Sequence, residues 1–290
     1  MARHHRLGLL GLCVTALAAC SVLPLPAEST LRPESPATNS LPTPASTFPP
    51  QPTITPQPPD TGWRLAHPGI EVRSVDVLAG QLTERLSIAR LDPHTVTLRV
   101  VYSPGIAYPV SIWAQRLGAL LVVNGGYFTE EALVTGLTVV EGQAFGTPYG
   151  DFAGMVAVTA DGAPSVRWLR TWPYDPAEPL QSAIQSFPVL VKPGGVMGFP
   201  ADGDDGRTSR RTVVAQDVQG RVVLLVAPRG YLSLHALAVW LAESDLDLDI
   251  ALNLDGGTST GFWMAGGSAT GGTQIESLMA VPAVIGVFER

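Results

Sequence analysis

The pattern of apolar and polar positions beyond about residue 63 is that of β-strands. Short runs rich in β-branched and aliphatic residues recur there, bounded by glycine, proline, aspartate and asparagine. The predicted strands are 95–102, 156–159, 165–168, 211–217, 221–227, 250–254 and 281–288. Asp161-Gly162 and Gln219-Gly220 each separate two neighbouring runs, so both pairs are predicted to form antiparallel hairpins.

Helical periodicity is limited to two segments. At 234–243 apolar residues recur at helical spacing, and Ser233 is a favourable N-cap. A shorter helix is predicted at 110–117, where Pro109 suits the start of a helix. Because strands outnumber helices, the predicted fold class is α+β, with mixed, mostly antiparallel sheets and few helices. This arrangement is compatible with two lobes around one site.

Two of the apolar runs end in the same way, with polar residues and a pair of glycines. The run 250–252 leads into Asn-Leu-Asp-Gly-Gly at 253–257, and the run 120–123 leads into Asn-Gly-Gly-Tyr-Phe at 124–128. Glycine pairs permit sharp turns and close backbone approach to a ligand. The alternative is that both loops are tight turns capped by asparagine or aspartate. We favour one site built from the two loops.

Taken together, these motifs resemble those of the phosphodiester glycosidase family. The run at 253–257 is the most specific, and the runs at 124–128, 183–191 and 210–214 contribute to the same resemblance. It covers roughly residues 63–290 and implies hydrolysis of a sugar-1-phosphodiester. One departure is Thr258, which stands where the family commonly has a third glycine. A β-branched residue restricts the loop there, so the shape of the site and its substrate can differ.

Cleavage of a sugar-1-phosphodiester develops positive charge on the sugar ring and negative charge on the departing phosphate. Asp255 is the predicted catalytic carboxylate beside the ring. Arg211 is the predicted catalytic group on the phosphate side, because a guanidinium matches phosphate oxygens as a planar fork. The structural alternatives are a turn cap for Asp255 and a surface ion pair for Arg211. Arg210 would point to the opposite face of an extended strand.

Further residues of these loops are predicted to bind substrate. The asparagines can hold sugar hydroxyls or orient Asp255, and Tyr127 can stack on a sugar ring or belong to the core. The predicted substrate-binding residues are Asn124, Gly125, Gly126, Tyr127, Thr212, Asn253, Gly256, Gly257 and Ser259. The second carboxylate of a glycosidase pair is sought among Glu130, Glu131 and Asp151. The sequence does not choose between them, since it does not encode their distance from Asp255.

The N-terminus has the features of a bacterial export signal. Arg3 belongs to a positive start, and the apolar stretch 7–18 is too short to span a bilayer comfortably. Leu-Ala-Ala-Cys at 17–20 resembles a lipoprotein processing site. We therefore predict lipidation of Cys20 and an exported domain anchored to the cell membrane, outside the cytoplasm. The alternative is an ordinary secretory signal cut near Ala19.

Composition divides the chain into three parts. Residues 1–19 are the predicted signal peptide, and residues 63–290 are the predicted phosphodiester glycosidase-like domain. Between them, residues 20–62 are rich in proline, serine and threonine and are predicted to be a disordered, extended tether.

Net charge and cysteine content limit which classes of partner, metal site and cofactor are expected. A formal net charge of −7 with few lysines gives no electrostatic footprint for nucleic acid. The expected partners are a phosphorylated sugar or glycan, and the membrane through Cys20. The only other cysteine, Cys13, lies in the leader, so no thiolate metal site is expected in the domain. The sequence requires no cofactor and is compatible with a divalent cation held by carboxylates.

Two classes of function stay open. The first is a lipid-anchored hydrolase of a sugar-1-phosphodiester in envelope or extracellular glycans. The alternative is a surface lipoprotein that binds a glycan or the cell wall without turnover. Both would use the same loops, and Asp255 favours the enzyme because a pure sugar binder needs no carboxylate there.

Overall fold

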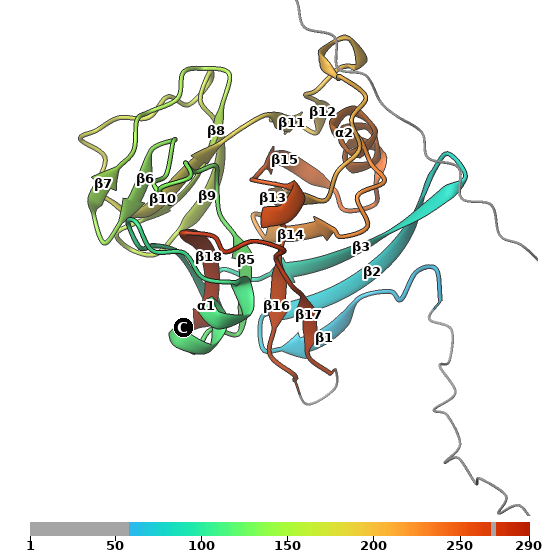
Figure 1. The fold of residues 1–290 in the computed structure, drawn as a ribbon, viewed down its shortest axis with the longest axis horizontal. Helices are drawn as coiled ribbons and strands as arrows, with labels where there is room; N and C mark the ends of the chain where they lie inside the picture. Colours follow the sequence, from blue (N-terminus) through green and yellow to red (C-terminus); the bar gives the residue numbers. More distant parts are fainter. Residues whose placement is uncertain (1–57, 268–270) are drawn as a thin grey trace, which may run out of the picture. The chain divides into compact units, whose positions relative to one another are not determined.

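A computed structural model describes residues 58–267 and 271–290 (Figure 1). The predicted signal peptide, Cys20 and most of the predicted tether lie outside these residues. The described residues belong to one compact unit. No helix among the described residues is long and apolar enough to cross a membrane.

The first sheet has eight strands, all paired antiparallel. In chain order they are β1 (Arg64–His67), β2 (Ile70–Ala79), β3 (Leu82–Leu91), β11 (Val189–Lys192), β12 (Val196–Met197), β13 (Arg211–Asp217), β14 (Val222–Ala227) and β15 (Leu248–Asn253). Their order in the sheet is β1-β2-β3-β14-β13-β15-β11-β12. The predicted hairpin at 211–227 is therefore β13–β14, in the middle of this sheet.

Two further sheets have five antiparallel strands each. The second sheet, in the order β7-β6-β10-β8-β9, contains β6 (Thr138–Val140), β7 (Gln143–Phe145), β8 (Gly154–Thr159), β9 (Pro164–Trp168) and β10 (Leu180–Ser186). The third, in the order β17-β16-β5-β18-β4, contains β4 (Val96–Tyr102), β5 (Leu121–Asn124), β16 (Phe262–Met264), β17 (Thr273–Ile275) and β18 (Ala283–Glu289). The described helices are α1 (Val110–Leu117), α2 (Leu234–Glu243) and two short 3₁₀ turns, η1 (Ala201–Gly203) and η2 (Gly257–Ser259).

Both predicted α-helices are present, and local chemistry explains their ends. Ser233 caps α2 by accepting a hydrogen bond from the Ala236 backbone N–H at 3.2 Å. Helix α1 follows Pro109 and ends at Gly118, whose φ of 59° is left-handed and suits glycine. The predicted α+β class, with mostly antiparallel sheets and few helices, is confirmed.

The three sheets share a central hydrophobic core, to which all of them contribute buried side chains, such as Leu252 from β15, Ile184 from β10 and Ile285 from β18. The other face of the first sheet is covered by α2, as the right-hand part of Figure 1 shows. Strand β14 is buried along its whole length because alternate residues enter the two cores: Leu224 the central one and Leu225 the α2 side. Burial on both faces explains its uninterrupted apolar sequence.

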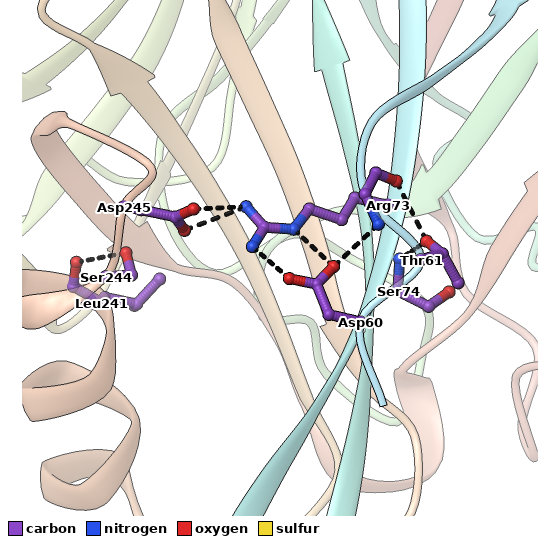
Figure 2. Close-up of polar contacts among 8 residues, drawn as sticks. Asp60, Thr61, Arg73, Ser74, Leu241, Ser244 and Asp245 are labelled. Carbon is purple, nitrogen blue, oxygen red and sulfur yellow. Dashed lines mark hydrogen bonds and ion pairs between the residues drawn. The ribbon is translucent and has the colours of Figure 1, made fainter. Parts of the chain in front are cut away.

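The chain joins this domain upstream of the predicted boundary at residue 63. Asp60 forms a bridge with Val75 of β2, and the Asp76 N–H donates to Pro59 O at 2.7 Å. Figure 2 shows the Arg73 guanidinium between Asp60 and Asp245, with N–O distances of 2.5 and 2.9 Å. Hydrogen bonds from Arg73 lower the pKa of Asp60 to about 2. The last residues of the tether therefore bind to the edge of the first sheet.

Candidate functional site

The two glycine-rich loops meet although they leave different sheets. Asn124 ends β5 in the third sheet, and Asp255 follows β15 in the first. The Asp255 N–H donates to Gly125 O at 3.2 Å, which joins the loops directly. Arg211 lies at the start of β13, the neighbour of β15, where Val213 pairs with Asn253. The candidate site therefore lies where strand ends from two sheets meet: the end of β5 in the third sheet, and the end of β15 and the start of β13 in the first.

The glycines are required because backbones pass very close to one another. A Cβ at Gly256 would lie 2.7 Å from Arg210 O, and one at Gly125 would lie 2.9 Å from Ala283 O. Such distances are too short for a side chain. The glycine pairs therefore bring the loops together, and any contact of their backbones with substrate stays a prediction.

The Asn124 side chain binds the backbone of the Asp255 loop. Its side chain is fully buried, and Nδ2 donates to Asp255 O at 2.7 Å. Oδ1 accepts from Thr212 Oγ1 at 2.7 Å and from Gly261 N at 3.1 Å. The amide is occupied by protein groups on both sides. Asn124 was predicted either to bind sugar hydroxyls or to orient Asp255, and these contacts fit the second role. Thr212, which donates to Asn124 Oδ1, is itself buried.

Asn253 connects the Asp255 strand to two aromatic residues. Its Nδ2 lies 3.0 Å from both Tyr127 Oη and Phe187 O. Tyr127 Oη in turn donates to Phe187 O at 3.0 Å. Burial, followed by the negative charge of Asp255, raises the pKa of Tyr127 to about 12, whereas Arg211 acts in the opposite direction. The Tyr127 hydroxyl therefore lies in the field of both predicted catalytic groups and stays protonated.

Asp255 is a half-buried carboxylate with two donors. Its Oδ1 accepts from the Gly256 N–H at 2.8 Å, and the Ser259 side chain also binds it. Burial raises the pKa of Asp255 above the usual range, and these two hydrogen bonds oppose that shift. Ser259 thus orients the carboxylate. The donors fix the carboxylate at a position from which its charge acts on the Tyr127 hydroxyl.

Arg211 is a half-buried cation without a carboxylate partner among the described residues. Its Nη2 donates to Arg207 O at 2.8 Å and its Nε to Leu232 O at 3.4 Å. Burial lowers the pKa of Arg211, while Tyr127, Asp204 and other nearby acidic groups oppose the shift. Backbone carbonyls hold this guanidinium without neutralising it, so it can attract an anion.

Arg210, which directly precedes β13, has different hydrogen-bond partners from Arg211. Its Nη2 donates to Glu276 O at 2.9 Å, and its buried Nε has no hydrogen-bond partner among the described residues. The candidates for a second carboxylate are all exposed: Glu130, Glu131 and Asp151. Asp151 pairs with Arg170 at 3.2 Å.

Three residues of the run 183–191 lie next to the site although the sequence did not predict them as site residues: Gln185, Ser186 and Phe187. Gln185 and Ser186 end β10, and both are buried. Gln185 Nε2 and Ser186 Oγ have no hydrogen-bond partner among the described residues. The signal was available, because these polar residues interrupt an otherwise apolar run at 183–191.

A separate cavity lies away from the two glycine-rich loops. This cavity of about 620 Å³ opens where β4 and β10 begin, the opposite strand ends from the two loops, and is lined by residues including Arg99, Glu141 and Gln181. It contains no residue of the predicted site. Within 58–267 and 271–290, no group of three or more histidine, cysteine, aspartate or glutamate residues is placed to hold a metal ion.

Comparison with known proteins gives the family. No curated protein matches the chain. Among solved structures it is similar to the catalytic domain of zebrafish N-acetylglucosamine-1-phosphodiester alpha-N-acetylglucosaminidase, auto-inhibited by its pro-peptide, with 20% identity, a TM-score of 0.59, and coverage of 79% of this chain and 85% of that chain. It is also similar to a hypothetical protein from Synechocystis, with 18% identity, a TM-score of 0.52 and coverage of 77% of this chain. The match spans 62% of the Synechocystis chain.

These likenesses support a shared fold. The sequence evidence is more specific, because the model of the phosphodiester glycosidase family matches residues 117–288. That segment contains both glycine-rich loops, the Arg211 strand and the β10 end. The chain therefore belongs to the phosphodiester glycosidase family.

Proposed function

We propose that this protein hydrolyses a sugar-1-phosphodiester at the bond between the anomeric carbon and the phosphate oxygen. The observation that carries the proposal is the placement of two half-buried groups at the adjacent ends of neighbouring strands: the carboxylate of Asp255, and the guanidinium of Arg211, which forms no ion pair with a carboxylate among the described residues. This arrangement matches the charge separation of the reaction, which places positive charge on the sugar and negative charge on the phosphate.

Each group has a distinct part in the proposed mechanism. The Asp255 carboxylate faces the anomeric carbon and stabilises the positive charge that develops there. Arg211 binds the phosphate oxygens, and its attraction strengthens as the leaving group gains charge. Tyr127, whose pKa of about 12 keeps its hydroxyl protonated at neutral pH, donates to Phe187 O and accepts from Asn253, so its role is to position Asn253 next to the Asp255 loop.

The zebrafish protein is named for N-acetylglucosamine-1-phosphodiester, so the methyl diester of N-acetylglucosamine-1-phosphate is a suitable first substrate. Release of free sugar should be measured for the wild type, Asp255→Asn and Arg211→Lys. Asp255→Asn keeps size but removes the charge, so kcat should fall by about 10²–10⁴-fold with little change in ground-state binding. Wild-type turnover in Asp255→Asn would remove the proposed catalyst.

Export and lipid anchoring are part of the same proposal. The support is the sequence: the charged start, the short apolar stretch and Leu-Ala-Ala-Cys ending at Cys20. The Pro-rich segment that follows would hold the domain away from the membrane surface. Replacing Cys20 with alanine should release the protein from membranes or leave the precursor unprocessed, whereas unchanged lipid labelling would contradict the anchor.

A further inference from the structure

Four aromatic rings form a continuous cluster from the proposed catalytic residues to the surface. Tyr127 lies 4.7 Å from Phe187, measured between ring centres. Phe187 lies 5.3 Å from Tyr149 and 5.5 Å from Phe152. We call Tyr127, Tyr149, Phe152 and Phe187 the aromatic cluster. It begins at the hydroxyl that meets Asn253 and ends at Phe152, which is 55% exposed.

Strand order places this cluster on a definite side of Asp255. Strand β15 lies between β13 and β11 in the first sheet. Arg211 begins β13, whereas Phe187 directly precedes β11, and the Asn253 N–H donates to Pro188 O at 3.0 Å. The end of β15, which leads into Asp255, therefore lies between Arg211 on one side and Phe187 on the other. If the phosphate binds Arg211 and the anomeric carbon faces Asp255, the remainder of the sugar extends toward the rings.

Specific contacts hold the rings in place. The Tyr149 backbone N–H donates to Gln185 Oε1 at 2.6 Å, fixing its loop to the end of β10. The Tyr149 ring packs so closely on Gly136 that a Cβ there would lie 2.6 Å from it. Phe152, which contacts both Tyr149 and Phe187, is thus presented on an anchored loop. Prepositioned rings offer large contact area at low entropic cost.

We propose that the aromatic cluster is a second sugar subsite, in which a pyranose ring linked to the reacting sugar stacks on Phe152. The inference rests on the proposed function for the direction of the substrate. The cluster continues beyond Tyr127 by two ring-to-ring contacts, more than one sugar needs. The substrate class is accordingly an oligosaccharide-1-phosphodiester, with the extra sugar on the side away from the phosphate.

The test compares monosaccharide and disaccharide substrates in matched variants. The probes are the methyl diester of N-acetylglucosamine-1-phosphate and 1,3-, 1,4- and 1,6-linked disaccharides carrying the same diester on the reducing sugar. Wild type should show a kcat/KM about three- to tenfold higher for at least one disaccharide, the value of one aromatic stacking contact. Phe152→Ala should remove that preference and leave monosaccharide kinetics unchanged.

Two controls separate stacking from general effects. Phe152→Tyr keeps the ring and should retain the preference. Leu78→Ala, at the tip of the β2–β3 hairpin and 79% exposed, removes an exposed apolar side chain elsewhere and should also retain it. Absence of any disaccharide preference in wild type, or its persistence in Phe152→Ala, would overturn the subsite.

Failure of the proposed function gives a different result, because wild type would then hydrolyse none of the diesters. In that case, saturation-transfer NMR with the same disaccharides lacking phosphate decides the inference. Transfer to the sugar in wild type that is lost in Phe152→Ala and kept in Phe152→Tyr supports the subsite. Equal transfer in all three proteins, or none, overturns it.

Discussion

Glu84 is a fully buried carboxylate that binds three backbone N–H groups, and its loss should weaken both the fold and the position of Arg211. Oε1 accepts from Arg85 N at 3.1 Å and from Arg229 N at 2.9 Å, and Oε2 accepts from Tyr231 N at 2.9 Å. The loop fixed in this way continues to Leu232, whose carbonyl accepts from Arg211 Nε. Glu84 therefore holds β3 against the segment that positions the guanidinium.

The expected magnitude follows from these contacts. Hydrogen bonds to a charged group are each worth about 1.5–3 kcal/mol. Glu84→Ala breaks three at once and leaves buried donors, while relief of carboxylate desolvation offsets part of the loss. We expect the free energy of unfolding to fall by roughly 3 kcal/mol. Glu84→Gln keeps the shape but turns an amide donor toward backbone N–H groups, so it should lose about half as much.

Urea unfolding followed by tryptophan fluorescence measures this change, provided that the transition is two-state. Glu71→Gln is the matched control, because Glu71 pairs with Arg90 at 2.7 Å but is partly exposed. It should cost about 1 kcal/mol or less. A Glu84→Ala protein as stable as the control variant would refute the assignment of Glu84 as a buried anchor.

Three further predictions concern pH and the loops. Because the pKa of Asp255 is raised in the folded state, the stability that its protonated form contributes is complete below the unfolded pKa and is lost as pH rises through the folded pKa. Asp255→Asn should therefore be more stable than wild type at neutral pH, and the difference should disappear in acid. Thermal melts at a series of pH values measure this difference. Asp60, with its pKa lowered to about 2, contributes stability that is complete above its unfolded pKa and is lost as pH falls through about 2. Since Asp60 is partly exposed, Asp60→Asn should cost about 1 kcal/mol or less at neutral pH, and this cost should shrink as pH falls through that range, which acid titration of unfolding measures. Gly256→Ala should reduce activity and stability together, because the added Cβ would lie 2.7 Å from Arg210 O. Circular dichroism measures the stability and the diester assay measures the activity; unchanged values of both would contradict the prediction.

The local elements were predictable because their signals are local. The apolar runs on either side of Gln219-Gly220 predict the β13–β14 hairpin, and Ser233 predicts the start of α2, where its side chain accepts from the Ala236 N–H. The same holds for the strand that leads to Asp255. Periodicity and capping depend on neighbours in sequence, so they can be recognised without the fold.

The supporting shell of the site could not be predicted in this way. Asn124 contacts Thr212 and Gly261, far from it in the chain, and only the meeting of two sheets creates those bonds. Glu84 gave no sequence signal, since its three donors come from backbone groups. Gln185 was visible as a polar residue in an apolar run, but its contact with Tyr149 depends on loop packing.

The central claim is that the carbon–oxygen bond at the anomeric centre breaks. Hydrolysis of the methyl diester of N-acetylglucosamine-1-phosphate in water enriched in oxygen-18 tests it directly, with mass spectrometry locating the label. Attack assisted by Asp255 and Arg211 predicts the label on the anomeric hydroxyl of the released sugar and none in the methyl phosphate. Label in the phosphate product would show cleavage between phosphorus and oxygen and would contradict the account.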